Sequence, residues 1–292
     1  MCEKYARGVK HLMHIGLTND REQVVAAIGF AQTNRGTVIG ADKTFYSDST
    51  GDTGVKTWSD QLMLWRVKKE LGYDGVSMGH FEAEECFLGE FNPKDPITHS
   101  HHRPELSEVA QVEAQLRNAY DTGFKGTFYI AHVSSTDTVD LVEKVRTFVG
   151  FPIVLETTWH HMLLNWEDYR QHGHFVKMNP PLRKQGRQMH HLEYVLQGRF
   201  DIIGTDHAPH TLERKKNEKP ASGVPALPFW PKGIDLLQKA GMKKETLDEL
   251  TFHNANRIFR LGLEPKEVTV EYDPQRWEFY GWNPFSRIDG TR

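Results

Sequence analysis

Short apolar segments alternate with longer amphipathic segments along most of this 292-residue chain. Brief apolar runs bounded by turn residues predict buried strands, and apolar residues spaced three to four apart predict helices. The alternation requires parallel strands joined by right-handed crossovers, in either an open doubly wound sheet or a (β/α)8 barrel. The predicted strands cover residues 11–17, 37–45, 75–80, 126–132, 151–156 and 201–206, with a weaker one over 174–178.

Two observations favour the barrel. No strand is followed by GxGxxG or GxxxxGK[ST], the phosphate-binding motifs of many open sheets. Polar residues also gather at the carboxyl ends of the strands, and in a barrel these ends converge on one mouth, where active sites are built. The residues placed in this way are Lys43, His80, His132, Glu156, Asn179 and Asp206.

Each of these residue types has a structural role as well as a catalytic one. A lysine can extend its ammonium to solvent, and an aspartate after a strand is often a turn residue. Alternatively, Lys43 forms a Schiff base or is carboxylated by CO2, which creates an anionic ligand able to bridge two metal ions. Histidine nitrogens with carboxylate oxygens form a zinc-type ligand set. Their occurrence together on successive strands favours the metal site.

The composition predicts a cytoplasmic protein that binds neither nucleic acid nor membrane. The net charge of -3 offers no basic face for nucleic acid. No apolar run approaches the length of a membrane span. The start of the sequence shows no basic segment followed by an apolar one, as a secretory leader would. The two cysteines, Cys2 and Cys86, form no CxxC pair.

Several segments resemble the dihydroorotase branch of the amidohydrolase superfamily, and they follow that family's order. They are GTDHAPH (204–210), KMNPPLR (177–183), AHVSSTDTVDLV (131–142) and ETTWHHMLLN (156–165). KTFYSDSTG (43–51) and GHFEAEE (79–85) resemble the family's carboxylated-lysine segment and its next metal-histidine segment. The resemblance extends over roughly residues 10 to 262. Hydantoinases and allantoinases resemble the chain less closely in the residues that follow Thr205, Asp206 and His207.

The resemblance implies a zinc-dependent barrel enzyme that interconverts N-carbamoyl-aspartate and dihydroorotate in pyrimidine biosynthesis. It implies one or two zinc ions bridged by carboxylated Lys43. A metal-activated hydroxide would attack the ring amide carbon, and Asp206, the catalytic residue, would pass its proton to the departing nitrogen. The implied metal ligands are Lys43, His80, His132 and Asp206, and the implied substrate-binding residues are Asn179 and His210.

Part of the family pattern is missing from this chain. The family opens its barrel with a strand ending in His-x-His, followed by a substrate-binding arginine. His11 and His14 do not replace that motif, because a separation of three along a strand places them on opposite faces. Residues 1–262 therefore correspond to barrel strands three to eight, and 263–292 to an extension left from a small β domain. The predicted fold is an α/β, (β/α)8 TIM-type barrel, incomplete at its N-terminus.

An arc of six strands would leave two sheet edges and an apolar interior exposed. We therefore expect a homo-oligomer or a completing partner chain, with aspartate transcarbamoylase as one candidate. The missing ligands leave three functions open. The chain is a dihydroorotase-like enzyme, an inactive dihydroorotase-like partner subunit, or a cyclic amidase of the hydantoinase or allantoinase type.

Smaller features are predicted to be structural. HSHHRPEL (99–106) is expected to be a solvated loop ahead of a helix, and ERKKNEK (213–219) a solvated face. Some of the paired histidines are expected at the surface or in loops: His101/His102, His160/His161 and His190/His191. Ala226 and Pro228 stand where the family has a glycine and a glutamate, so the loop geometry there is expected to differ.

Overall fold

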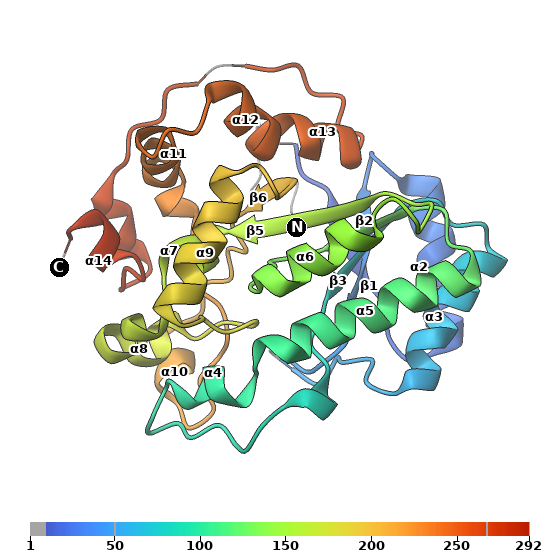
Figure 1. Ribbon diagram of the computed structural model, residues 1–292, viewed down its shortest axis with the longest axis horizontal. Coiled ribbons are helices and arrows are strands. Elements are labelled where there is room, and N and C mark those ends of the chain that lie inside the picture. The colour runs from blue at the N-terminus through green and yellow to red at the C-terminus, as the bar shows by residue number, and fades with distance from the viewer. Residues whose placement is uncertain (1–9, 50, 267, 292) are drawn as a thin grey trace.

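A computed structural model describes residues 10–49, 51–266 and 268–291. Six strands form one curled sheet in chain order, and every neighbouring pair is parallel (Figure 1). This arrangement confirms the predicted incomplete barrel. The strands are β1 (Met13–Gly16), β2 (Ile39–Phe45), β3 (Val76–His80), β4 (Thr127–Ile130), β5 (Ile153–Thr158) and β6 (Ile202–Gly204).

Helices in the crossovers cover the outer face of this sheet (Figure 1). The first, α2, begins after Asp20, whose carboxylate accepts the backbone N–H groups of Glu22 and Gln23 as an N-cap. The longer crossover helices are α2 (Arg21–Asn34), α3 (Trp58–Glu70), α5 (Glu105–Thr122), α6 (Thr136–Val145) and α9 (Gln185–Leu196). Among the described residues, no helix has the length and apolar character needed to cross a membrane.

Short helical segments lie between these elements, mostly near the carboxyl ends of the strands. The predicted weak strand over 174–178 is wrong, because Gly173–Val176 forms a 3-10 helix, η2. The other segments before β6 are η1 (Glu84–Cys86), α4 (Thr98–His102), α7 (Trp159–Leu163) and α8 (Trp166–His172). Those after β6 are α10 (Leu212–Lys216), η3 (Leu227–Phe229), α11 (Trp230–Lys239), α12 (Lys244–Asp248), the π-helix η4 (Glu249–His253) and α13 (Asn254–Ile258).

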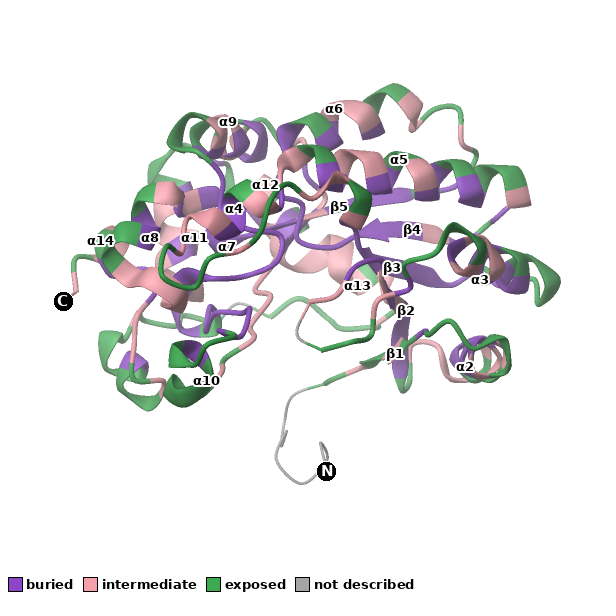
Figure 2. Cartoon of the chain, turned by 90° about the horizontal axis from the view of Figure 1, so that it is seen from below, coloured by how far each residue is buried: buried purple, intermediate pink, exposed green. Residues whose placement is uncertain are grey.

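The expectation of an exposed apolar interior is wrong. Residues of β2 to β6, together with Ala131 just after β4, form a buried cluster on the inner face. Its members are Ala41, Val76, Met78, Tyr129, Ala131, Val154 and Ile202. Ala255, Ile258 and Phe259, in and just after α13, pack against this cluster. The Phe259 ring lies 5.6 Å from the ring of Tyr129 and 5.9 Å from that of His14. A helix thus covers the inner face of the arc (Figure 2). Met13, on the edge strand β1, stays 53% exposed.

A buried ion pair outside the sheet fixes the direction of Lys43. The Lys68 ammonium of α3 lies 2.8 Å from the Asp42 carboxylate, and both side chains are fully buried. Side chains alternate between the two faces of a strand, so Asp42 on the outer face sends Lys43 to the inner face with Ala41. The pair therefore links the outer helix layer to the orientation of a predicted site residue.

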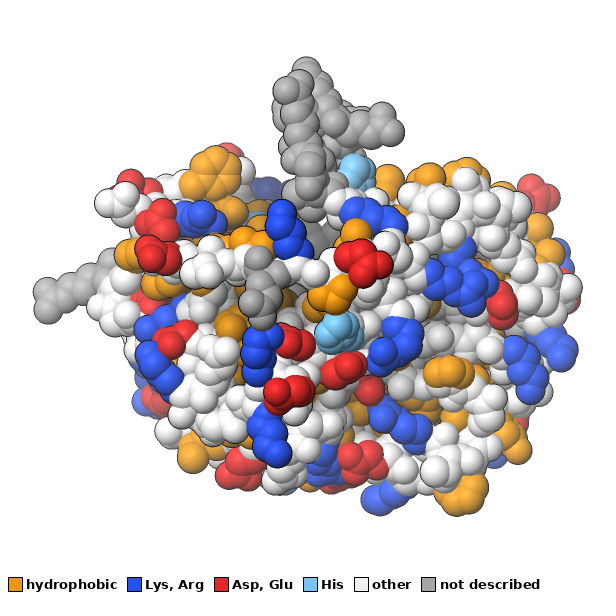
Figure 3. All heavy atoms as spheres, turned by 90° about the horizontal axis from the view of Figure 1, so that it is seen from above, with side chains coloured by type: hydrophobic (Ala, Val, Ile, Leu, Met, Phe, Trp, Pro, Cys, Tyr) orange, Lys and Arg blue, Asp and Glu red, His pale blue; other side chains and the backbone are white. Residues whose placement is uncertain are grey.

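The last part of the chain packs beside η3 and α8. It contains the 3-10 helix η5 (Pro274–Phe279) and α14 (Ser286–Asp289). The Phe285 ring stacks on Phe229 with centroids 4.1 Å apart, and the Arg287 guanidinium donates to the Asp168 carboxylate. Its assignment as the remnant of a separate β domain stays a prediction. On the face seen in Figure 3, acidic and basic side chains are intermixed.

Lys68→Met should lower the free energy of unfolding by about 3–5 kcal/mol, because it leaves the Asp42 carboxylate buried without its cation. Urea unfolding followed by tryptophan fluorescence would measure the loss. Lys69→Met, at an exposed position of the same helix, should change stability by about 0.5 kcal/mol or less. Equal losses in the two variants would contradict a role for the buried pair.

Candidate active site

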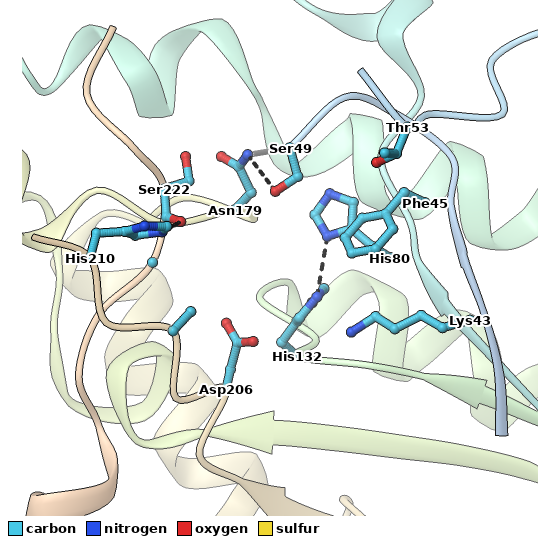
Figure 4. Close-up of a pocket in the computed structure, with 12 residues that line it drawn as sticks. Lys43, Phe45, Ser49, Thr53, His80, His132, Asn179, Asp206, His210 and Ser222 are labelled. Carbon is cyan, nitrogen blue, oxygen red and sulfur yellow. Dashed lines mark hydrogen bonds between the residues drawn. The ribbon is translucent and has the colours of Figure 1, made fainter. Parts of the chain in front are cut away.

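A polar cavity of about 260 Å³ opens at the carboxyl ends of the strands. It is lined by all six predicted site residues: Lys43, His80, His132, Asn179, Asp206 and His210. Figure 4 shows His80 and His132 side by side, with the Lys43 ammonium and the Asp206 carboxylate pointing into the adjoining space. Sequence reasoning missed Phe45, Ser49, Thr53 and Ser222, which also line the cavity.

Strand alternation brings Lys43 and His80 to the cavity, but His132 needs a backbone turn. Ala131 belongs to the inner cluster, so alternation alone would point His132 outward. His132 instead has φ 41°, in the left-handed region that non-glycine residues seldom adopt. Asp206 has the same φ and, like His132, lies two residues past the end of its strand. Strained backbone of this kind is found at functional sites.

The two histidines face each other through ring nitrogens. His80 Nδ1 lies 3.2 Å from His132 Nε2, and both side chains are buried. Burial lowers the pKa of His80 and lowers the pKa of His132 well below its ordinary value, so both rings are neutral at pH 7. Neutral imidazole is the form that binds metal ions.

Glu82 sets the orientation of His80. His80 Nε2 donates to the Glu82 carboxylate at 2.8 Å, which leaves Nδ1 as the nitrogen directed at His132. Although burial alone would raise it, the Arg103 guanidinium and His80 hold the pKa of Glu82 at about 2. Such carboxylate–histidine contacts fix the tautomer of metal-binding histidines. Glu82 lies two residues after His80, so its position in GHFEAEE was a usable signal.

Asp206 is held in a weakly solvated position close to other charges. Burial raises its pKa from 3.8 to about 7; the Lys43 ammonium opposes this rise and the Glu156 carboxylate adds to it. Glu156 also accepts the backbone N–H of His132 and the Tyr129 hydroxyl. A carboxyl group with this pKa can both take up and release a proton near neutral pH.

HSHHRPEL contributes to the site, contrary to its prediction as a solvated loop. His99 lies in α4 and is buried, and its Nε2 donates to Asn179 Oδ1 at 2.8 Å. The Asn179 amide in turn donates to Ser49 Oγ at 3.1 Å. These contacts orient the Asn179 side chain at the cavity wall. The contact between His99 and Asn179 spans eighty positions of the sequence, so local patterns give no signal for it.

The loop after β6 supplies His210, and His207 stabilises that loop through hydrogen bonds to a distant segment. His210 Nε2 donates to the carbonyl of Ser222 at 2.8 Å. His207 Nδ1 accepts the backbone N–H groups of Ala226 and Leu227, at 3.1 and 3.0 Å. Gly223 lies between these contacts with φ 135°, and a Cβ there would come within 2.6 Å of the Ala208 carbonyl oxygen. A residue without a side chain is therefore required at this part of the wall.

Other histidines and one lysine are more buried than predicted. His160, His161 and His191 are buried, as is Lys215 within the segment predicted to be a solvated face. Lys215 donates its ammonium protons to the backbone carbonyls of Lys177, Ala221 and Gly223. It thereby joins two segments of the cavity wall.

No family model matches the chain. The dihydroorotase of Halobacterium salinarum is 30% identical over 266 residues, which are 83% of this chain and 60% of that protein. The dihydroorotase of Archaeoglobus fulgidus is 36% identical over 255 residues, which are 86% of this chain and 56% of that protein. The chain is homologous to the dihydroorotases. It spans little more than half the length of these two relatives.

Solved structures share the fold of this dihydroorotase homologue. A D-hydantoinase (dihydropyrimidinase) from Thermus sp. superposes with a TM-score of 0.72 at 24% identity, over 90% of this chain and 59% of that one. A dihydroorotase from Saccharomyces cerevisiae, in complex with 5-fluoroorotic acid, gives a TM-score of 0.68 at 17% identity, over 88% and 69%. These likenesses show that the half-barrel shares its fold with part of each of those two proteins.

The histidine pair fits a divalent metal ion. Two nitrogens bound to one tetrahedral zinc at 2.0–2.1 Å lie about 3.3 Å apart, close to the 3.2 Å between His80 Nδ1 and His132 Nε2. His132 Nδ1 is buried without a hydrogen-bond partner among the described residues. Within that same part of the chain, no three His, Cys, Asp or Glu side chains form a metal-ion group. Lys43, once carboxylated, is the side chain that would complete the set.

Asp206 should make the metal-free protein less stable as pH rises. Between its ordinary pKa of 3.8 and its raised pKa of about 7, the folded chain keeps a proton that the unfolded chain has lost. Stability attributable to Asp206 therefore falls across this window. Asp206→Asn cannot ionise, so this part of the fall should disappear when urea unfolding is compared at about pH 5 and about pH 7.5. Asp52→Asn, at an exposed carboxylate, should lose as much unfolding free energy between the two pH values as the wild-type chain. A loss of the same size in Asp206→Asn would refute the assignment.

Proposed function

We propose that the chain is a dihydroorotase-like cyclic amidohydrolase that interconverts dihydroorotate and N-carbamoyl-aspartate in pyrimidine biosynthesis. The observation that carries the proposal is the meeting of Lys43, His80, His132 and Asp206 in one cavity of a dihydroorotase homologue. Its volume of about 260 Å³ suits a single small ring, since pockets for larger ligands begin near about 300 Å³. We also propose a cytoplasmic location.

His80, His132 and carboxylated Lys43 would hold zinc in this proposal. A bound zinc ion polarises a carbonyl group and lowers the pKa of water. The chain's own contribution is to keep the two rings neutral by burial and to orient His80 through Glu82. The Glu156 carboxylate fixes the backbone of His132, which holds its ring against His80.

Asp206 would move the proton in the reaction. It takes a proton from the attacking water and delivers it to the ring nitrogen as the amide bond breaks. Its pKa of about 7 matches both steps at neutral pH. Asn179 and His210, held by His99 and by the Ser222 carbonyl, would bind the substrate on the opposite wall.

We further propose that the chain works as a homo-oligomer or with a completing partner, for which aspartate transcarbamoylase is a candidate. The exposed edge strand β1 supports this, because three of its four residues are exposed and its outer edge has no strand neighbour within the described sheet. Unpaired strand edges are sites of association. An inactive partner subunit is the second candidate function, and the turnover rate of the assembled oligomer or complex separates the two.

The purified chain should bind at most about one zinc ion, because the ligands brought together are those of a single tetrahedral site. Lys43→Ala should abolish this binding, and Glu82→Gln should weaken it about ten- to a hundredfold by releasing the orientation of His80. Elemental analysis and zinc titration measure both effects. Lys125→Ala, at an exposed lysine, is the matched control. Two zinc equivalents in the wild-type chain would contradict the prediction.

The chain alone should hydrolyse dihydroorotate only in trace amounts. It lacks the His-x-His segment and the arginine that its family uses, and each lost stabilising group typically costs on the order of a hundredfold in rate. Substrate binding without turnover is the expected result, measured by calorimetry alongside a turnover assay. A rate near that of a complete dihydroorotase, lost in Asp206→Asn, would disprove this expectation and support a fully assembled site.

A further inference from the structure

A second cavity, of about 550 Å³, adjoins the active-site cavity and shares Ser49 and Ser222 with it. Its charged lining consists of three cations, Lys177, Arg214 and Lys219, and one carboxylate, Glu218. The lining therefore has an excess of positive charge. This excess lies beside the wall that carries Asn179 and His210.

Lys177 is the most unusual of these cations because it is buried without an acidic partner. Its exposed fraction is 8%, and its ammonium donates to Ser222 Oγ at 2.5 Å and lies 5.4 Å from the centre of the Phe91 ring. No carboxylate in the described ranges lies within ion-pair distance of it; Glu82, which pairs with His80 and Arg103, acts on its charge from farther away. Burying a cation without a counter-charge is unfavourable. An anion that entered the cavity would relieve that cost.

The surrounding groups reinforce the positive potential. Burial and the nearby Arg103 guanidinium lower the pKa of Lys177 to about 7, and the Glu82 carboxylate opposes them. The pKa of His210 is lowered first by burial and then by the charges of Lys215, Arg214 and Lys177. The same cations therefore act on the residue expected to contact substrate. Arg214 lies at the exposed side of this cavity, and its guanidinium has no ion-pair partner among the residues that the structure describes.

Once Lys43 is carboxylated, the described lining of the active-site cavity offers no lysine or arginine to a ligand carboxylate. Lys43 is the one lysine or arginine among its described lining residues, and in the proposed function Lys43 carries CO2. Dihydroorotate and N-carbamoyl-aspartate both bear carboxylates. Lys177 donates to the hydroxyl of Ser222, which lines both cavities, and His210 donates to the carbonyl of the same residue.

We propose that Lys177, with Arg214 at the outer side, forms a carboxylate-binding subsite that pairs with the carboxylate of the reactant. The inference rests on the proposed function, because it takes the reactant to be a ring that carries a carboxylate. The subsite gives the chain a preference for anionic over neutral dihydropyrimidines. Lys177 is thus a specificity-determining residue, and Lys215 positions it by holding its backbone carbonyl.

Calorimetric titration with three probes tests the subsite: dihydroorotate, dihydrouracil (the same ring without the carboxylate) and malonate. The wild-type chain should bind dihydroorotate at least about tenfold more tightly than dihydrouracil, as expected for a hydrogen bond to a charged group. Lys177→Met should remove this preference and weaken malonate binding by a similar factor. Lys177→Arg should retain most of the preference, and Lys125→Met should leave it unchanged.

Thermal unfolding must show that Lys177→Met is folded. Should it fail to fold, Arg214→Met decides, because that side chain is exposed, and it should weaken malonate and dihydroorotate binding without changing dihydrouracil binding. A preference for dihydroorotate that persists in the folded Lys177→Met variant, or malonate binding unaffected by either variant, would overturn the subsite. Malonate binding that depends on Lys177, with neither pyrimidine bound, would support the subsite and contradict the proposed function instead.

Discussion

The parallel direction of the six strands is the constraint on which the site depends. Their carboxyl ends lie at one edge, and within the strands the alternation of side chains sends one set of residues to the helices and the other to the inner face. On β2 the division is visible in adjacent residues. Asp42 pairs with Lys68 outside the sheet, and Lys43 points inward. The packing of the outer layer and the chemistry of the cavity are therefore set by the same register.

The sequence was sufficient for the strand order, because apolar runs mark the strands. Polar residues at strand ends and the family resemblance together indicated six residues that the structure brings into one cavity, while their roles stay predictions. The sequence was insufficient where contacts join distant segments. His99 orients Asn179 from eighty positions away, and the left-handed backbone of His132 reverses the direction that alternation would give it. The false strand over 174–178 has a local cause, since its short apolar pattern also fits the 3-10 turn found there.

The coverage of the inner face could not be predicted either. The absence of two barrel strands led to an expectation of exposed apolar residues, yet Ala255, Ile258 and Phe259 pack on the inner cluster. An apolar pattern in the sequence can indicate a helix but does not say which face of the sheet that helix covers. By closing the apolar part of the arc, this segment allows a half-barrel to hold a buried histidine pair. It supplies no polar group to the described lining of the cavity.

Burial gives the two sides of the cavity different electrostatic characters. Around His80 and His132, desolvation keeps both imidazole rings neutral. The Glu82 carboxylate holds the ring of His80, and the Glu156 carboxylate holds the backbone of His132. Around Lys177 and His210, cations outnumber carboxylates. A side of neutral imidazoles that faces a cationic side would suit the proposed reactant, which has a polar amide at one end and a carboxylate at the other. The orientation of the ring would then follow from charge as well as shape, because reversing it would bring the carboxylate against the carboxyl group of Asp206.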